Sequence, residues 1–244
     1  MMHVYTVAIQ KGGTAKTTTA AALVQAAAHT GRRALAIDLD PQGQFSFTIG
    51  ADTGRPGCFE LLEGAAAADT VQQIRPGLDA IPASWNLSTV TSGTGSARRL
   101  QKALAPIAGS YDIIVIDTPP TAGELQYNAL QASTGLIIPL QADIYNLQSL
   151  YQIVDTARQI QNSNPALQIT GIIFTQYDAR GTLTRQMKDS ITEQAGKMKI
   201  PCLGVIRNAI AVREAAALRQ SLFDYAPKSK PAADYMELFE RITQ

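Results

Sequence analysis

The sequence predicts an α/β fold in which a mostly parallel, twisted sheet carries helices on both faces. Its apolar runs are short and continuous in Val, Ile and Leu, which is typical of strands that are buried on both sides. Longer helical patterns separate these runs, and this alternation favours parallel strands joined by helices. Neither a linker nor an internal repeat is visible, so we expect one domain spanning residues 1–244.

The elements follow one another in a regular order. The expected strands are residues 4–9, 33–40, 112–117, 135–140, 169–175 and 202–206. The expected helices are residues 16–29, 96–107, 123–132, 146–162, 183–198, 211–221 and 232–242. The first helix is apolar nearly all round, which predicts that it is buried. The stretch 56–82 is less regular and is expected to hold a short helix and a small ribbon.

The composition argues against several classes of protein. The net charge is +1, so no overall field draws the chain to nucleic acid and any basic surface must be local. The two cysteines, Cys58 and Cys202, are far apart, which disfavours a disulfide framework or a zinc site. No apolar run approaches the length of a membrane span, and the first ten residues lack a signal-peptide pattern. We therefore expect a cytoplasmic protein.

The stretch "QKGGTAKTTT", residues 10–19, departs from the common phosphate-binding loop. The ordinary pattern G-x-x-x-x-G-K-[ST] would place glycines where Gln10 and Ala15 stand. A loop between a strand and a helix still offers backbone N–H groups and a helix N-terminus to an anion. Lys16 would then reach the outer phosphates, and Thr17 would ligate Mg²⁺. The alternative is a polar loop whose threonines merely cap the helix.

Aspartates end two further expected strands. Asp38 and Asp40 share one face of an extended strand, which suits a metal site with a water-orienting group, although Asp40-Pro41 is also a turn signal. In "YDIIVIDTPP", four apolar residues precede Asp117, as in a Walker B strand whose carboxylate holds Mg²⁺. The alternative for Asp117 is a helix N-cap. Because ligands bind beyond the carboxyl ends of parallel strands, the loop and these carboxylates together predict one nucleotide site.

On these residues the sequence resembles the ParA/MinD group of ATPases with a deviant Walker A motif. "KGGTAKTT" matches the pattern K-G-G-x-x-K-T-[ST] of that group. "IDLDPQG", "YDIIVIDTPP", "FTQYDAR" and "YAPKSKPAADYMEL" resemble ParA/Soj partition proteins in the same order, so the resemblance covers essentially the whole chain. It implies ATP and Mg²⁺ as ligands, slow hydrolysis and an ATP-dependent homodimer. It also implies non-specific DNA binding, compatible with association with the nucleoid, and a ParB-like partner protein, but no membrane binding.

The resemblance also implies roles for individual residues. Lys11 is the signature lysine, which would cross to the phosphates of the partner subunit. Asp40 would orient or deprotonate the attacking water, and Lys11, Lys16 and Asp40 form the expected catalytic set. The expected magnesium ligands are Thr17, directly, and Asp38 and Asp117, through water. The expected nucleotide-binding residues are Lys11, Gly12, Gly13, Thr14, Ala15, Lys16, Thr17, Thr18, Arg207 and Asn208.

The chain departs from the family pattern at three places. Ala15 replaces a glycine; because residue 15 adjoins the helix start, where φ is normally negative, we expect alanine to fit and ATP still to bind. "VIRN" lacks the proline of the usual "IPRN", which weakens the assignment of Arg207 and Asn208. The segment "RNAIAVREA" is one residue longer than usual. Candidate DNA-binding residues are Arg180, Arg213 and Lys228; the alternative for them is ordinary helical surface charge.

Three other functions stay open at this point. A membrane-positioning ATPase like MinD would need a basic amphipathic C-terminal helix, whereas "DYMELFERITQ" has three acidic residues and one arginine. A biosynthetic ligase of the same ATPase superfamily would need a substrate pocket. A catalytically weak regulatory or scaffold relative of ParA would keep the loop without turnover.

Overall fold

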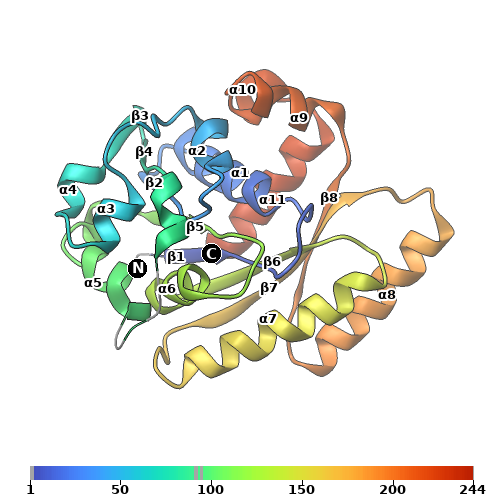
Figure 1. Cartoon of the computed structure of the whole chain (residues 1–244). Coiled ribbons are helices and arrows are strands. Elements are labelled where there is room, and N and C mark those ends of the chain that lie inside the picture. The colour runs from blue at the N-terminus through green and yellow to red at the C-terminus, as the bar shows by residue number, and fades with distance from the viewer. Residues whose placement is uncertain (1–2, 91–92, 94–95, 244) are drawn as a thin grey trace.

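In the computed structural model, which describes residues 3–90, 93 and 96–243, eight strands form one sheet (Figure 1). The strands are β1 (His3–Val7), β2 (Ala34–Asp38), β3 (Gln72–Arg75), β4 (Leu78–Ile81), β5 (Ile113–Asp117), β6 (Gly135–Leu140), β7 (Gln168–Tyr177) and β8 (Cys202–Arg207). Their order across the sheet is β3-β4-β2-β5-β1-β6-β7-β8. Only β3 runs antiparallel to its neighbour among these strands. The mostly parallel sheet expected from the sequence is therefore confirmed.

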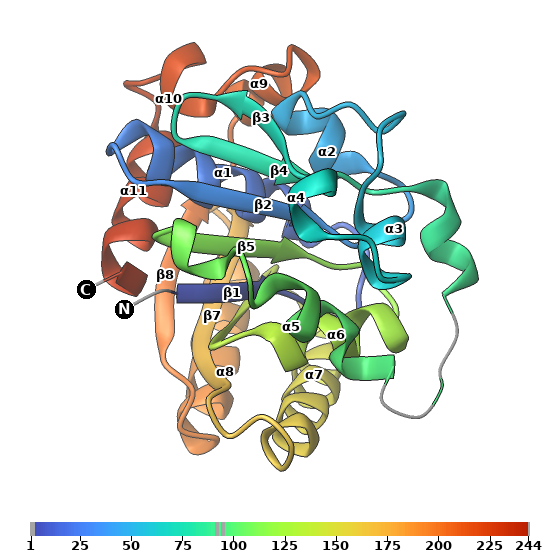
Figure 2. The same ribbon diagram turned by 90° about the vertical axis from the view of Figure 1, so that its left-hand side faces the viewer.

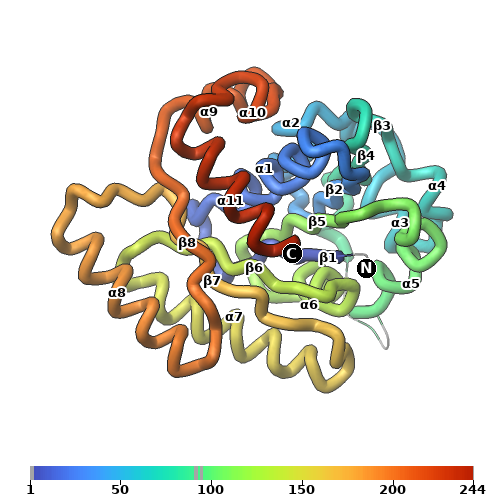
Figure 3. Tube along the Cα trace, turned by 180° about the vertical axis from the view of Figure 1, so that it is seen from behind, coloured from blue at the N-terminus to red at the C-terminus, as the bar shows by residue number. Residues whose placement is uncertain are grey.

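Helices connect the strands and cover both faces of the sheet. The α-helices are α1 (Lys16–His29), α2 (Gln44–Ile49), α3 (Cys58–Leu62), α4 (Ala67–Thr70), α5 (Arg99–Leu104), α6 (Glu124–Ala132), α7 (Tyr145–Gln161), α8 (Thr182–Lys197), α9 (Ile210–Ala217), α10 (Leu222–Tyr225) and α11 (Lys230–Thr243). Short 3₁₀ turns are η1 (Trp85–Thr89), η2 (Ser96–Arg98) and η3 (Ala108–Ser110). The opposite views of Figures 1 and 3 show α7 in front of the sheet and α11 behind it.

Side chains of the central strands alternate between two apolar clusters. In β5, Ile113 and Val115 pack with residues of α1 and α11, whereas Ile114 and Ile116 pack with residues of α3 and α5. In β6, Leu136, Ile138 and Leu140 belong to a third cluster, in which they pack with residues of α7 and α8. Because both faces of each strand are covered, no position in them needs to be polar, which explains the continuous apolar runs in the sequence.

The expected elements form, with differences at their ends. The six expected strands are present with ends shifted by no more than two residues, and the helix at 16–29 has the expected bounds. The ribbon expected within 56–82 is β3-β4, but β4 also pairs in parallel with β2 and so extends the main sheet. The helix expected at 96–107 is shorter, because a 3₁₀ turn precedes α5. Helices α2 and α10 had no counterpart in the sequence analysis.

The chain ends close to where it begins. Figure 2 shows β1 and the end of α11 beside each other, and the Tyr5 hydroxyl donates a hydrogen bond to the carbonyl of Ile242. The apolar face of α11, which includes Tyr235, Leu238 and Phe239, is buried against α1 and β8. The last helix is therefore part of the core.

The register of the central strands gathers three loops at one edge of the sheet. Asp38 at the end of β2 lies opposite Asp117 at the end of β5, and Val7 at the end of β1 also pairs with Asp117. The loops that follow β1, β2 and β5 therefore leave the sheet side by side, at the carboxyl ends of parallel strands.

Candidate functional site

The loop between β1 and α1 is held from outside by side chains of other strands. Gly13, with φ of 75°, adopts a left-handed conformation that suits glycine, and its carbonyl accepts hydrogen bonds from the amides of Gln141, at 3.2 Å, and Gln176, at 3.1 Å. The carbonyl of Thr14 accepts a bond of 3.0 Å from the Thr175 hydroxyl. Since these bonds occupy carbonyl groups, the loop is left with N–H donors for a ligand.

The inner side of this loop lines a hollow of about 370 Å³ that also contacts Asp40 and Gln42. A Cβ atom built on Gly12 or Gly13 would meet no atom within 4 Å, so the loop leaves open space beside its backbone. The Lys16 side chain is only 7% exposed, and its ammonium donates to the carbonyl of Lys11 at 2.8 Å. Burial lowers the pKa of Lys16, while the nearby carboxylates of Asp117 and Asp40 oppose that shift.

Two buried carboxylates face each other next to the start of α1. The Thr17 hydroxyl donates to Asp117 Oδ2 at 2.7 Å, while Asp117 Oδ1 is buried and has no hydrogen-bond partner among the described residues. Asp38, which is 2% exposed, accepts bonds from both the backbone N–H and the hydroxyl of Ser46, at 2.8 and 2.7 Å. Burial raises the pKa of Asp38 to about 6 and that of Asp117 well above its ordinary range, although hydrogen bonds from Ser46 and Thr17 oppose these shifts.

This arrangement fits a hard divalent cation. Carboxylate and hydroxyl oxygens are the ligands that Mg²⁺ prefers, and its sites use few protein ligands together with water and substrate phosphates. Asp117 Oδ1 is the unpaired buried oxygen that such an ion would satisfy, and a cation would also offset the burial of both carboxylates. The three residues expected from the sequence to ligate magnesium, Thr17, Asp38 and Asp117, are thus brought together.

Asp40 lies at the edge of the same hollow. It is partly buried, its backbone N–H donates to Asp38 Oδ1 at 3.1 Å, and its carboxylate accepts from the N–H of Gln42 at 3.0 Å. These two bonds fix the turn after β2, so that Asp40 faces the hollow formed by the glycine loop. A carboxylate in this place can accept a proton from a water molecule in the hollow.

Lys11, the expected signature lysine, is engaged within its own chain. Its ammonium lies 3.1 Å from both carboxylate oxygens of Asp143 and 5.8 Å from the centre of the Tyr145 ring. The structure therefore places the Lys11 side chain against the segment that follows β6, and Lys11 is not among the residues that line the hollow.

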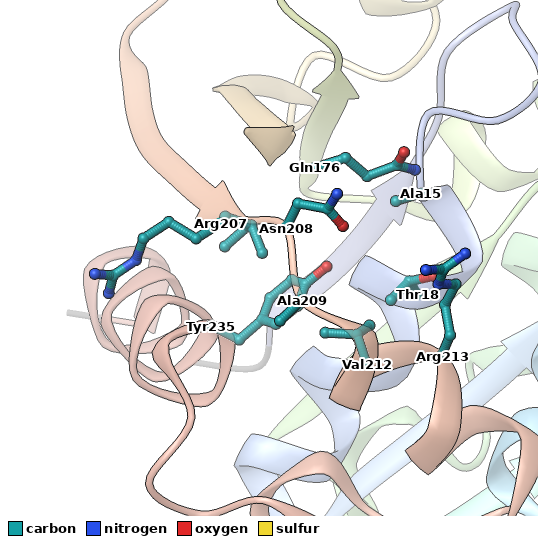
Figure 4. A pocket seen from close by; sticks show the side chains of 10 residues that line it. Ala15, Thr18, Gln176, Arg207, Asn208, Ala209, Val212, Arg213 and Tyr235 are labelled. Atoms are coloured by element: carbon teal, nitrogen blue, oxygen red, sulfur yellow. The ribbon is translucent and has the colours of Figure 1, made fainter. Parts of the chain in front are cut away.

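A second, smaller hollow of about 180 Å³ adjoins the first, and both are lined by Ala15, Thr18 and Gln176. Asn208 lines it, as the sequence suggested (Figure 4). Arg207 lines it as well, but its guanidinium turns away toward α11, where its Nε lies 2.9 and 3.1 Å from the two carboxylate oxygens of Asp234.

The expectation for the backbone of Ala15 is wrong. Its φ and ψ are 61° and 33°, a left-handed conformation, although it directly precedes the first helical residue. The chain must reverse its twist there to pass from the loop into α1, and such a turn favours glycine. An alanine in this conformation costs about 1–2 kcal/mol relative to an unstrained residue.

The three candidate DNA-binding residues lie on different segments. Arg180, 91% exposed, follows β7 and pairs with Asp178 at 2.6 Å. Lys228 is exposed between α10 and α11. Arg213, on α9, lines the smaller hollow.

Sequence reasoning missed several residues that shape the site. Ser46 lies on the short helix α2, which carries no periodic signal. Gln141 and Asp143 directly follow β6, and inspection of the residues after that strand would have identified them. In the part of the chain that the structure describes, no helix is both long and apolar enough to cross a membrane.

Comparisons with known proteins agree with this geometry. A family model described as an AAA domain matches residues 2–169. The chromosome partitioning protein ParA of Caulobacter vibrioides is 35% identical over 99% of this chain and 94% of its own length. The chromosome-partitioning ATPase Soj of Thermus thermophilus is 33% identical over 96% of this chain and 92% of its own.

Solved structures are similar over almost the whole chain. Cobyrinic acid a,c-diamide synthase from Mycobacterium smegmatis, with a bound ATP analog and magnesium, is 31% identical with a TM-score of 0.84, covering 98% of this chain and 93% of that one. An ATP complex of McdA from Cyanothece has a TM-score of 0.86 at 22% identity, covering 99% and 95% of the two chains, and so supports the fold alone.

Proposed function

Because the chain belongs to the ParA/Soj family of P-loop ATPases, we propose that it is an ATP-dependent dimeric switch for DNA partitioning. In this proposal it binds Mg²⁺-ATP, dimerises, binds DNA without sequence preference and hydrolyses ATP slowly. One observation carries the proposal: Thr17 donates to Asp117, whose other oxygen is buried without a partner in the described structure, next to Asp38 and an open glycine loop.

The residues of the chain divide the work of phosphoryl transfer. Thr17, Asp38 and Asp117 would hold Mg²⁺, which when bound neutralises charge on the phosphate oxygens. Lys16 sits at the loop, buried enough that its charge acts in a low dielectric. Asp40 orients the attacking water and accepts its proton. Most of the catalysis then comes from positioning and charge, as phosphoryl transfer requires.

Lys11 supports the dimeric part of the proposal. Its ammonium is paired with Asp143, outside the hollow of its own chain. A lysine that is held outside its own site can act in trans on the phosphates bound by a second copy. Dimerisation then completes the site, so hydrolysis and assembly depend on each other.

We propose the remaining partners by analogy with the family. ParA and Soj relatives carry names that refer to chromosome partitioning. We extend that role to this chain, with a ParB-like protein that stimulates hydrolysis and with DNA held by exposed cations such as Arg180 and Lys228. Both segments are exposed, and the attraction to phosphates should fall steeply with salt.

A membrane-positioning role like that of MinD is disfavoured by the last described helix. Membrane binding through an amphipathic helix requires an apolar face that is free to enter the bilayer. The apolar face of α11 is already buried against α1 and β8. Release of α11 from these elements would expose core side chains such as Phe239.

A second candidate function is an amide-forming biosynthetic ATPase. The observation that favours it is the 31% identity to a solved structure named cobyrinic acid a,c-diamide synthase. Such an enzyme would turn over ATP only with its acid substrate and would show no ATP-dependent dimer bound to DNA. Stimulation of hydrolysis by cobyrinic acid and a nitrogen donor for the amide, without any response to DNA, would support this candidate against the first.

The test combines hydrolysis with molecular mass. Wild type, Asp40→Ala and Lys11→Ala are compared by light scattering with ATP, with ADP and without nucleotide, and phosphate release is measured in parallel. We expect Asp40→Ala to form an ATP-only dimer without phosphate release, and Lys11→Ala to bind ATP but stay monomeric. A wild-type mass that does not respond to ATP would contradict the switch. Single-turnover hydrolysis separates a slow ATPase from a scaffold that has lost turnover.

A further inference from the structure

Two arginines near the end of β8, Arg207 and Arg213, both line the smaller hollow, but their guanidinium groups are engaged differently. Arg207 was expected at the nucleotide, yet its guanidinium is bound to Asp234 of α11 and also donates to the carbonyl of Lys230. Arg213 was expected at DNA, yet it lines the smaller hollow together with Thr18 (Figure 4). The cation that faces this hollow is therefore Arg213.

The smaller hollow lies beside the phosphate-binding loop, on the side away from Lys16 and Asp40. It shares Ala15, Thr18 and Gln176 with the larger hollow, but Lys16 and Asp40 line only the larger one. A nucleotide whose outer phosphates lie at Lys16 therefore extends into the smaller hollow with its inner phosphate and nucleoside. Arg213 faces that inner portion of the ligand.

The charge of Arg213 is available for a ligand. It is exposed, and no carboxylate among the described residues forms an ion pair with it. Arg207, only six residues earlier, is paired. The first turn of α1 carries no acidic side chain, so this end of the hollow is electropositive through both the guanidinium and the helix N-terminus.

We propose that Arg213 is a nucleotide-binding residue, which contacts the inner phosphate or the ribose of the bound nucleoside di- or triphosphate. This proposal rests on the function proposed above. Arg213 lies on α9, within the stretch "RNAIAVREA" that is one residue longer than the usual family form, so the resemblance assigns it no counterpart and its role is inferred from its position beside the hollow. The guanidinium of Arg213 also offers the nucleotide an extra hydrogen-bond donor near Ala15, whose methyl group replaces the glycine of the family pattern.

The position of Arg213 predicts how its replacement should change the Kd for ATP and for ADP. A residue at the γ-phosphate would discriminate ATP from ADP, whereas one at the inner phosphate or ribose contributes equally to both. Loss of a charge-assisted hydrogen bond at an exposed site should weaken binding about ten-fold. Arg213→Ala should therefore raise the Kd for Mg²⁺-ADP and for a non-hydrolysable Mg²⁺-ATP analogue by the same factor, with their ratio unchanged.

The test uses calorimetric titration of both nucleotides into the full chain. Arg213→Lys, which keeps the charge without the planar fork, should lie between wild type and Arg213→Ala. Arg219→Ala is the matched control, because Arg219 follows the same helix but stacks on Phe47 outside the smaller hollow. Melting temperatures without nucleotide show whether each variant is folded.

Each outcome decides between the two proposals. Equal weakening for both nucleotides supports the assignment of Arg213. If the wild type binds the nucleotides and Arg213→Ala binds them with a Kd within two-fold of the wild-type value, the assignment of Arg213 is wrong while the proposed function stands. If that variant then also fails to bind DNA, Arg213 is a DNA-binding residue. If the wild type binds neither nucleotide, the proposed function itself fails.

Discussion

The ammonium group of Lys11 lies 3.1 Å from both carboxylate oxygens of Asp143. The same carboxylate accepts hydrogen bonds from the N–H groups of Tyr145 and Asn146 at the start of α7, so its position is fixed by the helix. In a dimer that uses Lys11 in trans, this ion pair must first open. Asp143 thus opposes the proposed dimerisation by the free energy of one partly exposed pair in each subunit.

Replacing Asp143 by asparagine should make the dimer easier to form. The substitution keeps the size of the side chain and an oxygen for the N–H groups of α7, but releases the charge of Lys11. A partly exposed pair contributes about 0.2–1 kcal/mol, and a dimer opens one such pair in each subunit, so we expect the dissociation constant of the ATP-bound dimer to fall by about two- to thirty-fold. Analytical ultracentrifugation with Asp40→Ala in both proteins measures it. A dimer weakened by Asp143→Asn would show that Asp143 is needed across the interface.

The left-handed conformation of Ala15 leads to a stability test. Ala15→Gly should raise the free energy of unfolding by about 0.5–1 kcal/mol, because relief of the positive φ of 61° exceeds the entropy that glycine adds to the unfolded chain. For a chain of this size, that gain raises the melting temperature by about 1–4 °C. Ala28→Gly, in the last turn of α1, should instead lower stability by about 0.5–1 kcal/mol. Equal losses in both variants would mean that residue 15 is not left-handed in solution.

The strands that anchor the glycine loop can be tested through Thr175. Its hydroxyl, buried, donates to the carbonyl of Thr14 at 3.0 Å, and Thr175→Val keeps the shape while removing that bond. A lost buried hydrogen bond of about 1 kcal/mol should loosen the loop and raise the Kd for Mg²⁺-ADP by about five-fold. Thr192→Val removes a hydroxyl that bonds only within α8 and should leave the Kd unchanged. An unchanged Kd in Thr175→Val would show that the loop needs no such anchor.

Asp178 forms an ion pair with Arg180, the residue that the sequence suggested as a DNA-binding cation. Its hydrogen bonds with Arg180 hold the pKa of Asp178 at about 2, below the ordinary 3.8. A depressed carboxyl pKa means that the pair is intact above pH 3.8 and is lost only as the pH falls toward 2. The carboxylate therefore cancels the charge of Arg180 throughout the neutral range.

Asp178→Asn should strengthen ATP-dependent DNA binding for that reason. One freed phosphate contact should steepen the dependence of log K on log salt by about 0.9. Gel shifts of plasmid DNA over a series of salt concentrations measure the slope, and Arg180→Ala in the same background should remove the gain. If Asp178→Asn binds DNA as the wild type does, Arg180 is ordinary surface charge.

The central part of the site could be predicted because its residues stand at strand ends. Asp38 and Asp117 each end a continuous apolar run, and parallel strands place such residues at one edge, while Thr17 was identified from the spacing of the loop that leads into α1. The same reasoning positioned the first helix correctly, since α1 is buried and apolar nearly all round. Pattern and topology were sufficient wherever a regular element positions the side chain.

The remaining features depend on loop geometry and on contacts between distant segments. The φ of Ala15 is set by how the loop closes onto α1, which no periodicity records. Arg207 on β8 pairs with Asp234 on α11. Because these residues are distant in the sequence, the sequence around either one does not predict that the guanidinium of Arg207 turns away from the hollow. Lys11 with Asp143 is a contact of the same kind.

Ser46 joins the turn after β2 to the end of β4. Its hydroxyl donates to Asp38 Oδ2 at 2.7 Å and accepts from the backbone N–H of Ala83 at 2.9 Å. Ser46 is buried, so no water can replace either bond. It therefore acts as a positioning residue for one expected magnesium ligand.

Ser46→Ala should separate this positioning role from stability. Removing the hydroxyl leaves the buried N–H of Ala83 unpaired, which should lower the free energy of unfolding by about 1–3 kcal/mol. Asp38 also loses a bond that favours its charged form, so we expect the Mg²⁺ concentration that half-saturates nucleotide binding to rise several-fold. Ser88→Ala, whose hydroxyl bonds the carbonyl of Trp85 at the surface, should change neither quantity. If stability falls while the Mg²⁺ dependence matches wild type, Ser46 only joins the two segments and does not position Asp38.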